Sequence, residues 1–144
     1  TPIGARHVAT IMALERLLRK RVSDEIGISV QSPIQLSDFS EPQPDIVLVR
    51  PRDDSYMHAL PQPEDVLLLI EVSDTTAAYD RNTKVPLYAR AGIGELIDLA
   101  ASVVEVFREP RAEGYRSVTR PGRDESLTPL AIQGLSLPVG EMLV

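Results

Sequence analysis

Two nearly continuous apolar runs constrain the fold of this chain most strongly. The stretch from Asp45 to Arg50 reads DIVLVR, and the stretch from Val66 to Val72 reads VLLLIEV. Neither run alternates between apolar and polar residues, which is typical of strands buried on both faces of a sheet. The sequence therefore predicts two central strands, one beginning at Asp45 and the other carrying Glu71 close to its end.

Two helices are expected around these strands. Residues 1–22 begin with a capping threonine and a proline suited to the first helical position, and they carry an apolar stripe at helical spacing. A second helix is expected to begin near Asn82 or Thr83 and to end at 91–92, because Pro86 is best tolerated in a first turn. Lys84 would then lie in that first turn.

The remaining segments predict further strands and surface loops. The strand patterns cover residues 28–36, with an interruption or bulge near Pro33, and residues 95–99, 103–107 and 115–119. Segments 95–99 and 103–107 should form an antiparallel hairpin, with Glu105 on a solvated face. We expect one domain over residues 1–144, of mixed α/β class, with a central mixed sheet of four or five strands flanked by helices.

Composition limits the classes of function. The chain has 144 residues, a net charge of −6 and no cysteine. An acidic surface repels phosphate, so any contact with nucleic acid should be local. No run approaches the ~20 apolar residues of a membrane span, and we expect a cytoplasmic protein with no membrane contact. The first residue is Thr1 rather than methionine, which suggests that an N-terminal segment is missing.

The two strand-end acids predict a metal site. Asp45 and Glu71 could meet if their strands are antiparallel neighbours, and hard oxygen ligands of this kind suit Mg²⁺ or Mn²⁺. Lys84 is one of only two lysines in the chain. An ammonium near such an ion can hold or polarise an attacking water, which is chemistry suited to hydrolysis of a phosphodiester.

The order of these residues resembles that of a known group of nucleases. The pattern consists of Pro44-Asp45, Glu71-Val72-Ser73, Asp80, Lys84 and the segment LYARAG at 87–92. It resembles the PD-(D/E)XK nuclease superfamily, and more specifically the Uma-two family of restriction-endonuclease-like proteins. In the parent motif a lysine stands two residues after the second acid. Here Ser73 takes that position and Lys84 takes the role from the following helix, a displacement characteristic of the Uma-two family.

The resemblance implies a restriction-endonuclease-like core and a role for each matching residue. Asp45 and Glu71 would bind Mg²⁺ or Mn²⁺ together with the main-chain carbonyl of Val72. Lys84 would position the attacking water. The implied function is metal-dependent endonuclease cleavage of DNA, and a homodimer is expected because superfamily nucleases that cut both strands often pair.

The resemblance also implies supporting roles for residues around this set. Glu15 would correspond to the first-helix glutamate that many members place near the metal. The alternative is that Glu15 lies at the edge of the apolar stripe and pairs with Arg19. The residues expected to surround and support the metal ligands are Gln43, Ser73 and Asp80.

Two alternatives remain open at this level. Either acid alone could form a local ion pair, with Arg50, Arg81 or Arg90 as candidates. The whole chain could also be a catalytically inactive nuclease-like scaffold that serves as an interaction module. Its acidic charge and the GELIDLA segment at 94–100, where the family usually carries a Tyr-Trp pair, favour that alternative. The candidate phosphate contacts are Arg16, Arg19, Lys20, Arg81 and Arg90.

Overall fold

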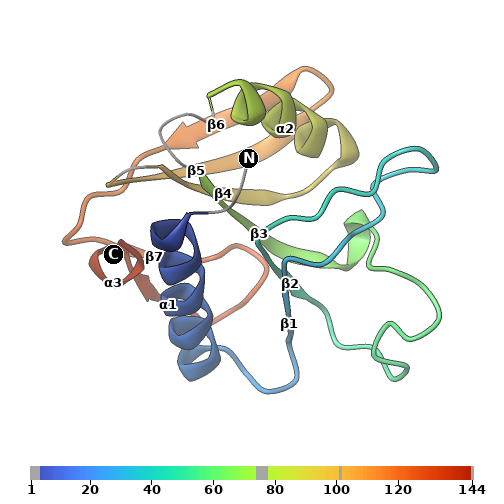
Figure 1. Ribbon diagram of the computed structural model, residues 1–144, viewed down its shortest axis with the longest axis horizontal. Coiled ribbons are helices and arrows are strands. Elements are labelled where there is room, and N and C mark those ends of the chain that lie inside the picture. Colours follow the sequence, from blue (N-terminus) through green and yellow to red (C-terminus); the bar gives the residue numbers. More distant parts are fainter. Residues whose placement is uncertain (1–3, 74–77, 101, 144) are drawn as a thin grey trace.

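A computed structural model describes residues 4–73, 78–100 and 102–143, and it contains one mixed six-stranded sheet (Figure 1). The strands lie side by side in chain order: β1 (Gly27–Val30), β2 (Ile46–Val49), β3 (Val66–Ser73), β4 (Glu95–Ala100), β5 (Val103–Arg111) and β6 (Gly114–Thr119). Strands β3 and β4 are parallel, and every other neighbouring pair is antiparallel. The mixed α/β class is confirmed, with six strands in place of the four or five expected.

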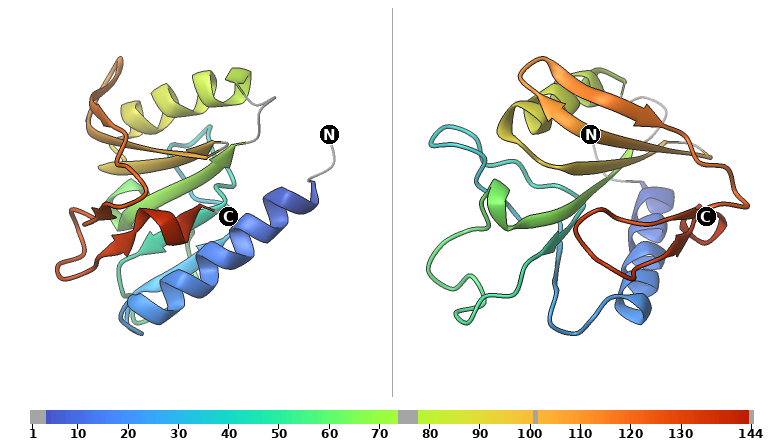
Figure 2. Two further views of the ribbon diagram at one scale, coloured as in Figure 1. Left: turned by 90° about the vertical axis from the view of Figure 1, so that its left-hand side faces the viewer. Right: turned by 180° about the vertical axis from the view of Figure 1, so that it is seen from behind.

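The sheet lies between two layers (Figure 2). On one face lies the helix α1 (Ala5–Arg21), beside the C-terminal segment with β7 (Ser126–Leu127), β8 (Leu137–Pro138) and the short helix α3 (Val139–Met142). On the other face lies α2 (Ala78–Ala91), while the 3-10 turn η1 (Pro63–Asp65) leads into β3. Among the described helices none is long and apolar enough to cross a membrane.

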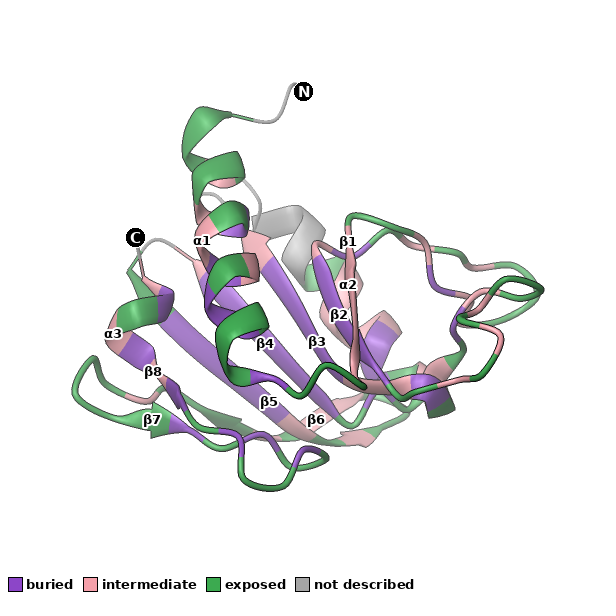
Figure 3. Ribbon diagram, turned by 90° about the horizontal axis from the view of Figure 1, so that it is seen from below, coloured by how far each residue is buried: buried purple, intermediate pink, exposed green. Residues whose placement is uncertain are grey.

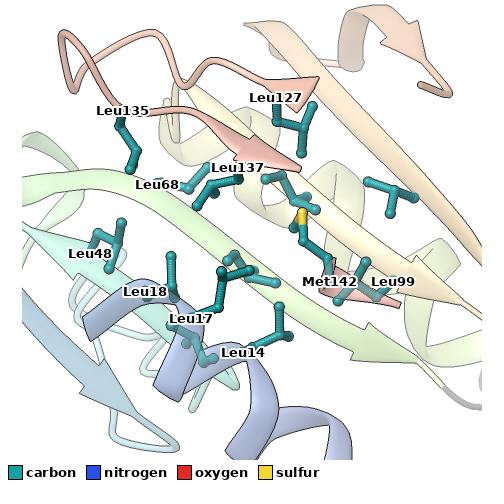
Figure 4. Close-up of a cluster of buried hydrophobic side chains, with 14 of the residues drawn as sticks. Leu14, Leu17, Leu18, Leu48, Leu68, Leu99, Leu127, Leu135, Leu137 and Met142 are labelled. Atoms are coloured by element: carbon teal, nitrogen blue, oxygen red, sulfur yellow. The ribbon is translucent and has the colours of Figure 1, made fainter. Parts of the chain in front are cut away.

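The larger apolar core lies between the sheet and the α1 layer (Figure 4). Ile11, Leu14 and Leu18 repeat at helical spacing along α1 and are buried against the strands. Leu135 and Leu137 from the C-terminal segment close the same cluster. Helix α1 is therefore fixed against the sheet by its apolar stripe.

The face under α2 combines a smaller apolar cluster with buried acids. Glu71, Asp98 and Glu105 lie in register on β3, β4 and β5, and all three are buried. The expectation that Glu105 faces solvent is therefore wrong. The Arg120 guanidinium, which follows β6, donates from Nε to Glu105 at 2.9 Å and supplies the opposite charge that burial of an acid requires.

Two predicted boundaries differ from the structure. Helix α2 begins at Ala78 and holds Pro86 in its interior, so Lys84 lies beyond the first turn. Pro86 removes the hydrogen bond to the carbonyl of Asn82, but Asn82 is exposed and water can satisfy that group. The first strand ends at Val30, because Gln31 takes a left-handed conformation with φ of 51° and turns the chain away. The predicted helix start at residues 1–2 lies outside the described residues.

Candidate active site

The register of the two central strands brings the predicted acids together. Strands β2 and β3 are antiparallel with Ile46 opposite Ile70, so Asp45 and Glu71 face each other one residue further along. The amide of Asp45 donates to Glu71 Oε1 at 2.9 Å, and the amide of Val72 donates to Asp45 Oδ2 at 2.8 Å. Each acid is thus held by the main chain of the opposite strand.

Helix α2 adds a cation and a hydroxyl to the same carboxylate. Lys84 Nζ lies 3.1 Å from Glu71 Oε2, and the Tyr88 hydroxyl donates to that oxygen at 3.2 Å. Lys84 and Tyr88 are four residues apart and therefore lie on one face of the helix. The Lys84 side chain is 37% exposed and the Glu71 side chain 9%, so the lysine reaches from solvent to a buried acid.

The electrostatic environment favours a proton on Glu71 more than is usual for a glutamate. Burial is the main reason that its pKa is raised, and the negative charge of Asp45 raises it further, while Lys84 acts in the opposite direction. Burial also raises the pKa of Tyr88, and the charge of Glu71 adds to that effect. The Tyr88 hydroxyl therefore keeps its proton and acts as a donor.

A histidine that the sequence reasoning did not select lies against Asp45. His7 Nε2 is 3.3 Å from Asp45 Oδ1. The signal in the sequence is its spacing, because His7 precedes Ile11, Leu14 and Leu18 by four, seven and eleven residues. His7 therefore belongs to the sheet-facing stripe of α1, one turn before the apolar part begins.

The structure places Glu15 apart from this group. Its carboxylate pairs with Arg19 Nη2 at 2.8 Å, which is the local i,i+4 interaction given above as the alternative. Glu15 lies eight residues beyond His7, about 12 Å along the helix axis. Among the described residues, the Glu15 carboxylate contacts Arg19 and has no contact with Asp45 or Glu71.

The predicted supporting residues differ in where they lie. Ser73 donates from Oγ to Asp98 Oδ1 at 2.6 Å, directly after the Glu71–Val72 pair. Gln43 is exposed, and the side chain of Asp80 lies outside the described part of the chain. Arg50 pairs with Asp65 at 2.7 Å and so does not neutralise either site acid.

The donor set fits a small divalent cation that keeps much of its water. Among the described residues no group of three or more acids, histidines or cysteines is close enough to enclose a metal. Mg²⁺ commonly takes one or two carboxylates and fills its other positions with water. Asp45 and Glu71 provide two. Burial is the main cause of the raised pKa of Glu71 and the charge of Asp45 adds to it, and a bound cation would relieve the repulsion between the two acids.

Comparison with known proteins agrees with the motif pattern. The model of the family Uma2, described as putative restriction endonuclease, matches residues 1–140. No curated protein matches the chain. The matched range includes Asp45, Glu71 and Lys84, together with the helix that carries His7.

Proposed function

This chain belongs to the Uma2 family of putative restriction endonucleases, and we propose that it is a metal-dependent endonuclease that hydrolyses phosphodiester bonds in DNA. One observation carries the proposal: Asp45 and Glu71 face each other across β2 and β3, and α2 adds Lys84 at 3.1 Å from Glu71. Two acids and an ammonium at one strand end are the parts that hydrolysis of a phosphodiester requires.

Each residue of the site would have its own role in the reaction. Asp45 and Glu71 would hold Mg²⁺ or Mn²⁺ with the carbonyl of Val72, and the bound ion would supply Lewis-acid stabilisation of the charge on the phosphoryl group. Lys84 would hold the attacking water, because its ammonium is half-exposed and reaches the same end of the sheet. Tyr88 would fix the Glu71 carboxylate through its hydroxyl.

Contacts with DNA would be few and local. Arg16 and Lys20 are exposed on the second half of α1, nine and thirteen residues beyond His7, which is about 14–20 Å along the helix. They could therefore reach only phosphates about one duplex width from the cleaved bond. Cleavage of both strands would need a second copy of the chain, since each copy supplies one such site, and we propose a homodimer for that reason.

Cleavage of supercoiled plasmid tests the proposal. Asp45→Asn and Lys84→Met should each lower the Mn²⁺-dependent or Mg²⁺-dependent rate by about 100-fold or more, because each removes a charge that acts in the transition state. Arg111→Met is the control, since Arg111 is an exposed cation on β5 whose guanidinium donates to the neighbouring Pro110 carbonyl. Cleavage that persisted in both site variants would rule the proposal out.

A second candidate is a catalytically inactive scaffold that serves as an interaction module. It is favoured by the closed hydrogen bonding of the site, in which His7, the Val72 amide, the Asp45 amide, Lys84 and Tyr88 together supply a donor to every carboxylate oxygen of Asp45 and Glu71. Such a network is satisfied without a cation. Calorimetry with Mn²⁺ separates the candidates: binding that Glu71→Gln abolishes supports the enzyme, and no binding to the wild type supports the scaffold.

A further inference from the structure

We propose that His7 is a positioning residue for Asp45, which orients the carboxylate for cation binding from the α1 side of the sheet. The inference rests on the proposed function, in which Asp45 is a metal ligand. The ionised Asp45 carboxylate can only accept hydrogen bonds, so the His7 Nε2 atom that faces it carries the hydrogen. His7 acts through Asp45 and has no assigned contact with substrate.

Two donors from different elements fix the Asp45 carboxylate. The Val72 amide of β3 donates to Oδ2 at 2.8 Å, and His7 of α1 faces Oδ1 at 3.3 Å. With the Val72 amide alone, the carboxylate could still turn about its last side-chain bond. A second donor on the other oxygen removes that freedom, and both side chains are shielded, with 18% of His7 and 15% of Asp45 exposed.

The packing of α1 explains how His7 can reach Asp45 without disturbing the apolar core. Ile11, Leu14 and Leu18 fix the helix against the sheet, and its first turns extend beyond the strand ends (Figure 3). His7 continues the same stripe past the edge of the apolar core, where Asp45 lies. A polar ring at this position therefore leaves the core unchanged while it places a donor at the site.

The contribution of α1 to the site thus comes from its first turns. Glu15, the residue expected to make that contribution, is held by Arg19. Groups that hydrogen-bond to metal ligands typically change metal affinity by 10–100-fold when removed. An effect of that size is expected from loss of the His7 donor.

The test compares glutamine and asparagine at position 7, because their side-chain amides reach different distances from the helix. In His7→Gln the side-chain nitrogen can reach about as far as Nε2, whereas in His7→Asn it cannot. We expect His7→Asn to weaken Mn²⁺ binding by about 10-fold or more in calorimetry, and His7→Gln to stay within about 3-fold of wild type. Ala9→Asn, at an exposed position of the same helix, controls for the low helix propensity of asparagine.

A second readout uses the metal-free protein. The ¹H–¹⁵N resonance of the Val72 amide reports its hydrogen bond to Asp45 Oδ2. It should shift in His7→Asn and stay near its wild-type position in His7→Gln. If wild-type protein bound no Mn²⁺, the proposed function would fail, and this resonance would still decide whether His7 orients Asp45.

Three results would overturn the inference. The first is an unmoved Val72 resonance in His7→Asn. The second is wild-type Mn²⁺ affinity in the same variant. The third is imidazole nitrogen coupling in the pulsed electron paramagnetic resonance spectrum of the Mn²⁺ complex, because it would make His7 a direct ligand.

Discussion

Two buried glutamates on opposite faces of the sheet have different surroundings. Glu95 opens β4 on the α1 face, and its side chain is 2% exposed. The Arg108 guanidinium lies 2.7 Å from Glu95 Oε2, and the Leu130 amide donates to Oε1 at 2.8 Å. Glu71 is also buried, but it faces a second acid, Asp45, and its cation is the half-exposed Lys84.

The difference lies in the kind of counter-charge that each buried acid has. An arginine offers a planar fork of fixed donors, which suits a permanent ion pair, whereas a lysine is a mobile point charge on a flexible stem. Arg108 also donates to the Thr128 carbonyl, so its pair with Glu95 attaches the C-terminal segment to the sheet. Burial beside Asp45 instead raises the pKa of Glu71. Placing two acids together costs stability, and such costs are typical of functional sites.

The largest expected effect comes from removing the arginine. Arg108→Ala leaves the Glu95 carboxylate buried without its guanidinium and should lower the free energy of unfolding by about 3 kcal/mol in urea denaturation. The matched control is Arg111→Ala on the same strand, where the guanidinium donates to the neighbouring Pro110 carbonyl and the residue is exposed. That control should stay within about 0.5 kcal/mol of wild type. Equal losses in the two variants would remove the structural role assigned to the Glu95–Arg108 pair.

Much of the fold was predictable because apolar periodicity determines it. The nearly continuous apolar runs at 45–50 and 66–72 form central strands, and the hairpin of β4 and β5 has the expected antiparallel pairing. Glu105 could not be assigned from its local pattern, because its partner Arg120 comes from the far end of β6. The start of α2 was missed because Pro86 lies in the helix interior, a position that its missing N–H and its ring normally disfavour.

The site was predictable only in part. Asp45, Glu71 and Lys84 could be selected by their order and by resemblance, and the structure brings these three together. The spacing of His7 to the apolar residues of α1 places it on the sheet-facing stripe, but its meeting with Asp45 depends on how the helix packs on the sheet. Tyr88 lies in the segment 87–92 that carries the resemblance, but it was assigned no role there, and only the packing of α2 shows that its hydroxyl reaches Glu71.

Removing the Tyr88 hydroxyl should have the next largest effect. Tyr88→Phe deletes a buried hydrogen bond to a carboxylate, and such bonds contribute about 1.5–3 kcal/mol. Tyr115→Phe is the matched control, because that hydroxyl donates to the neutral Ile93 carbonyl at 2.7 Å and should cost about 1 kcal/mol. Both losses can be measured by urea denaturation. A larger loss at Tyr115 than at Tyr88 would contradict the assignment of the stronger hydrogen bond to the Glu71 carboxylate.

The raised pKa of Glu71 predicts a smaller effect that depends on pH. Below the ordinary glutamate range, the carboxyl is protonated in both the folded and unfolded chains. As pH rises, the unfolded chain ionises first, so the fold loses stability until pH exceeds the raised pKa. The stability of Glu71→Gln relative to wild type, measured in EDTA, should therefore increase as pH rises above the ordinary glutamate range.

The second carboxylate provides the control for that pH dependence. Asp45 is one cause of the raised pKa of Glu71, so the same comparison in an Asp45→Asn background should give a shallower increase. An unchanged slope would show that burial alone sets the pKa. The contrast between Glu71 and Glu95 would then depend on their cations and not on the neighbouring acid.

The smallest expected effect concerns Glu15, which belongs neither to the surroundings of Glu71 nor to those of Glu95. Glu15→Gln removes an exposed i,i+4 pair with Arg19 and should cost about 0.3–0.5 kcal/mol. Mn²⁺ affinity should not change, because the Glu15 carboxylate lies two turns along α1 from His7. A loss of affinity comparable to that of Glu71→Gln would mean that α1 moves when the cation binds, and would restore the role that the family resemblance suggests for Glu15. An unchanged affinity would leave the first turns of α1, with His7, as the part of the helix that serves the site.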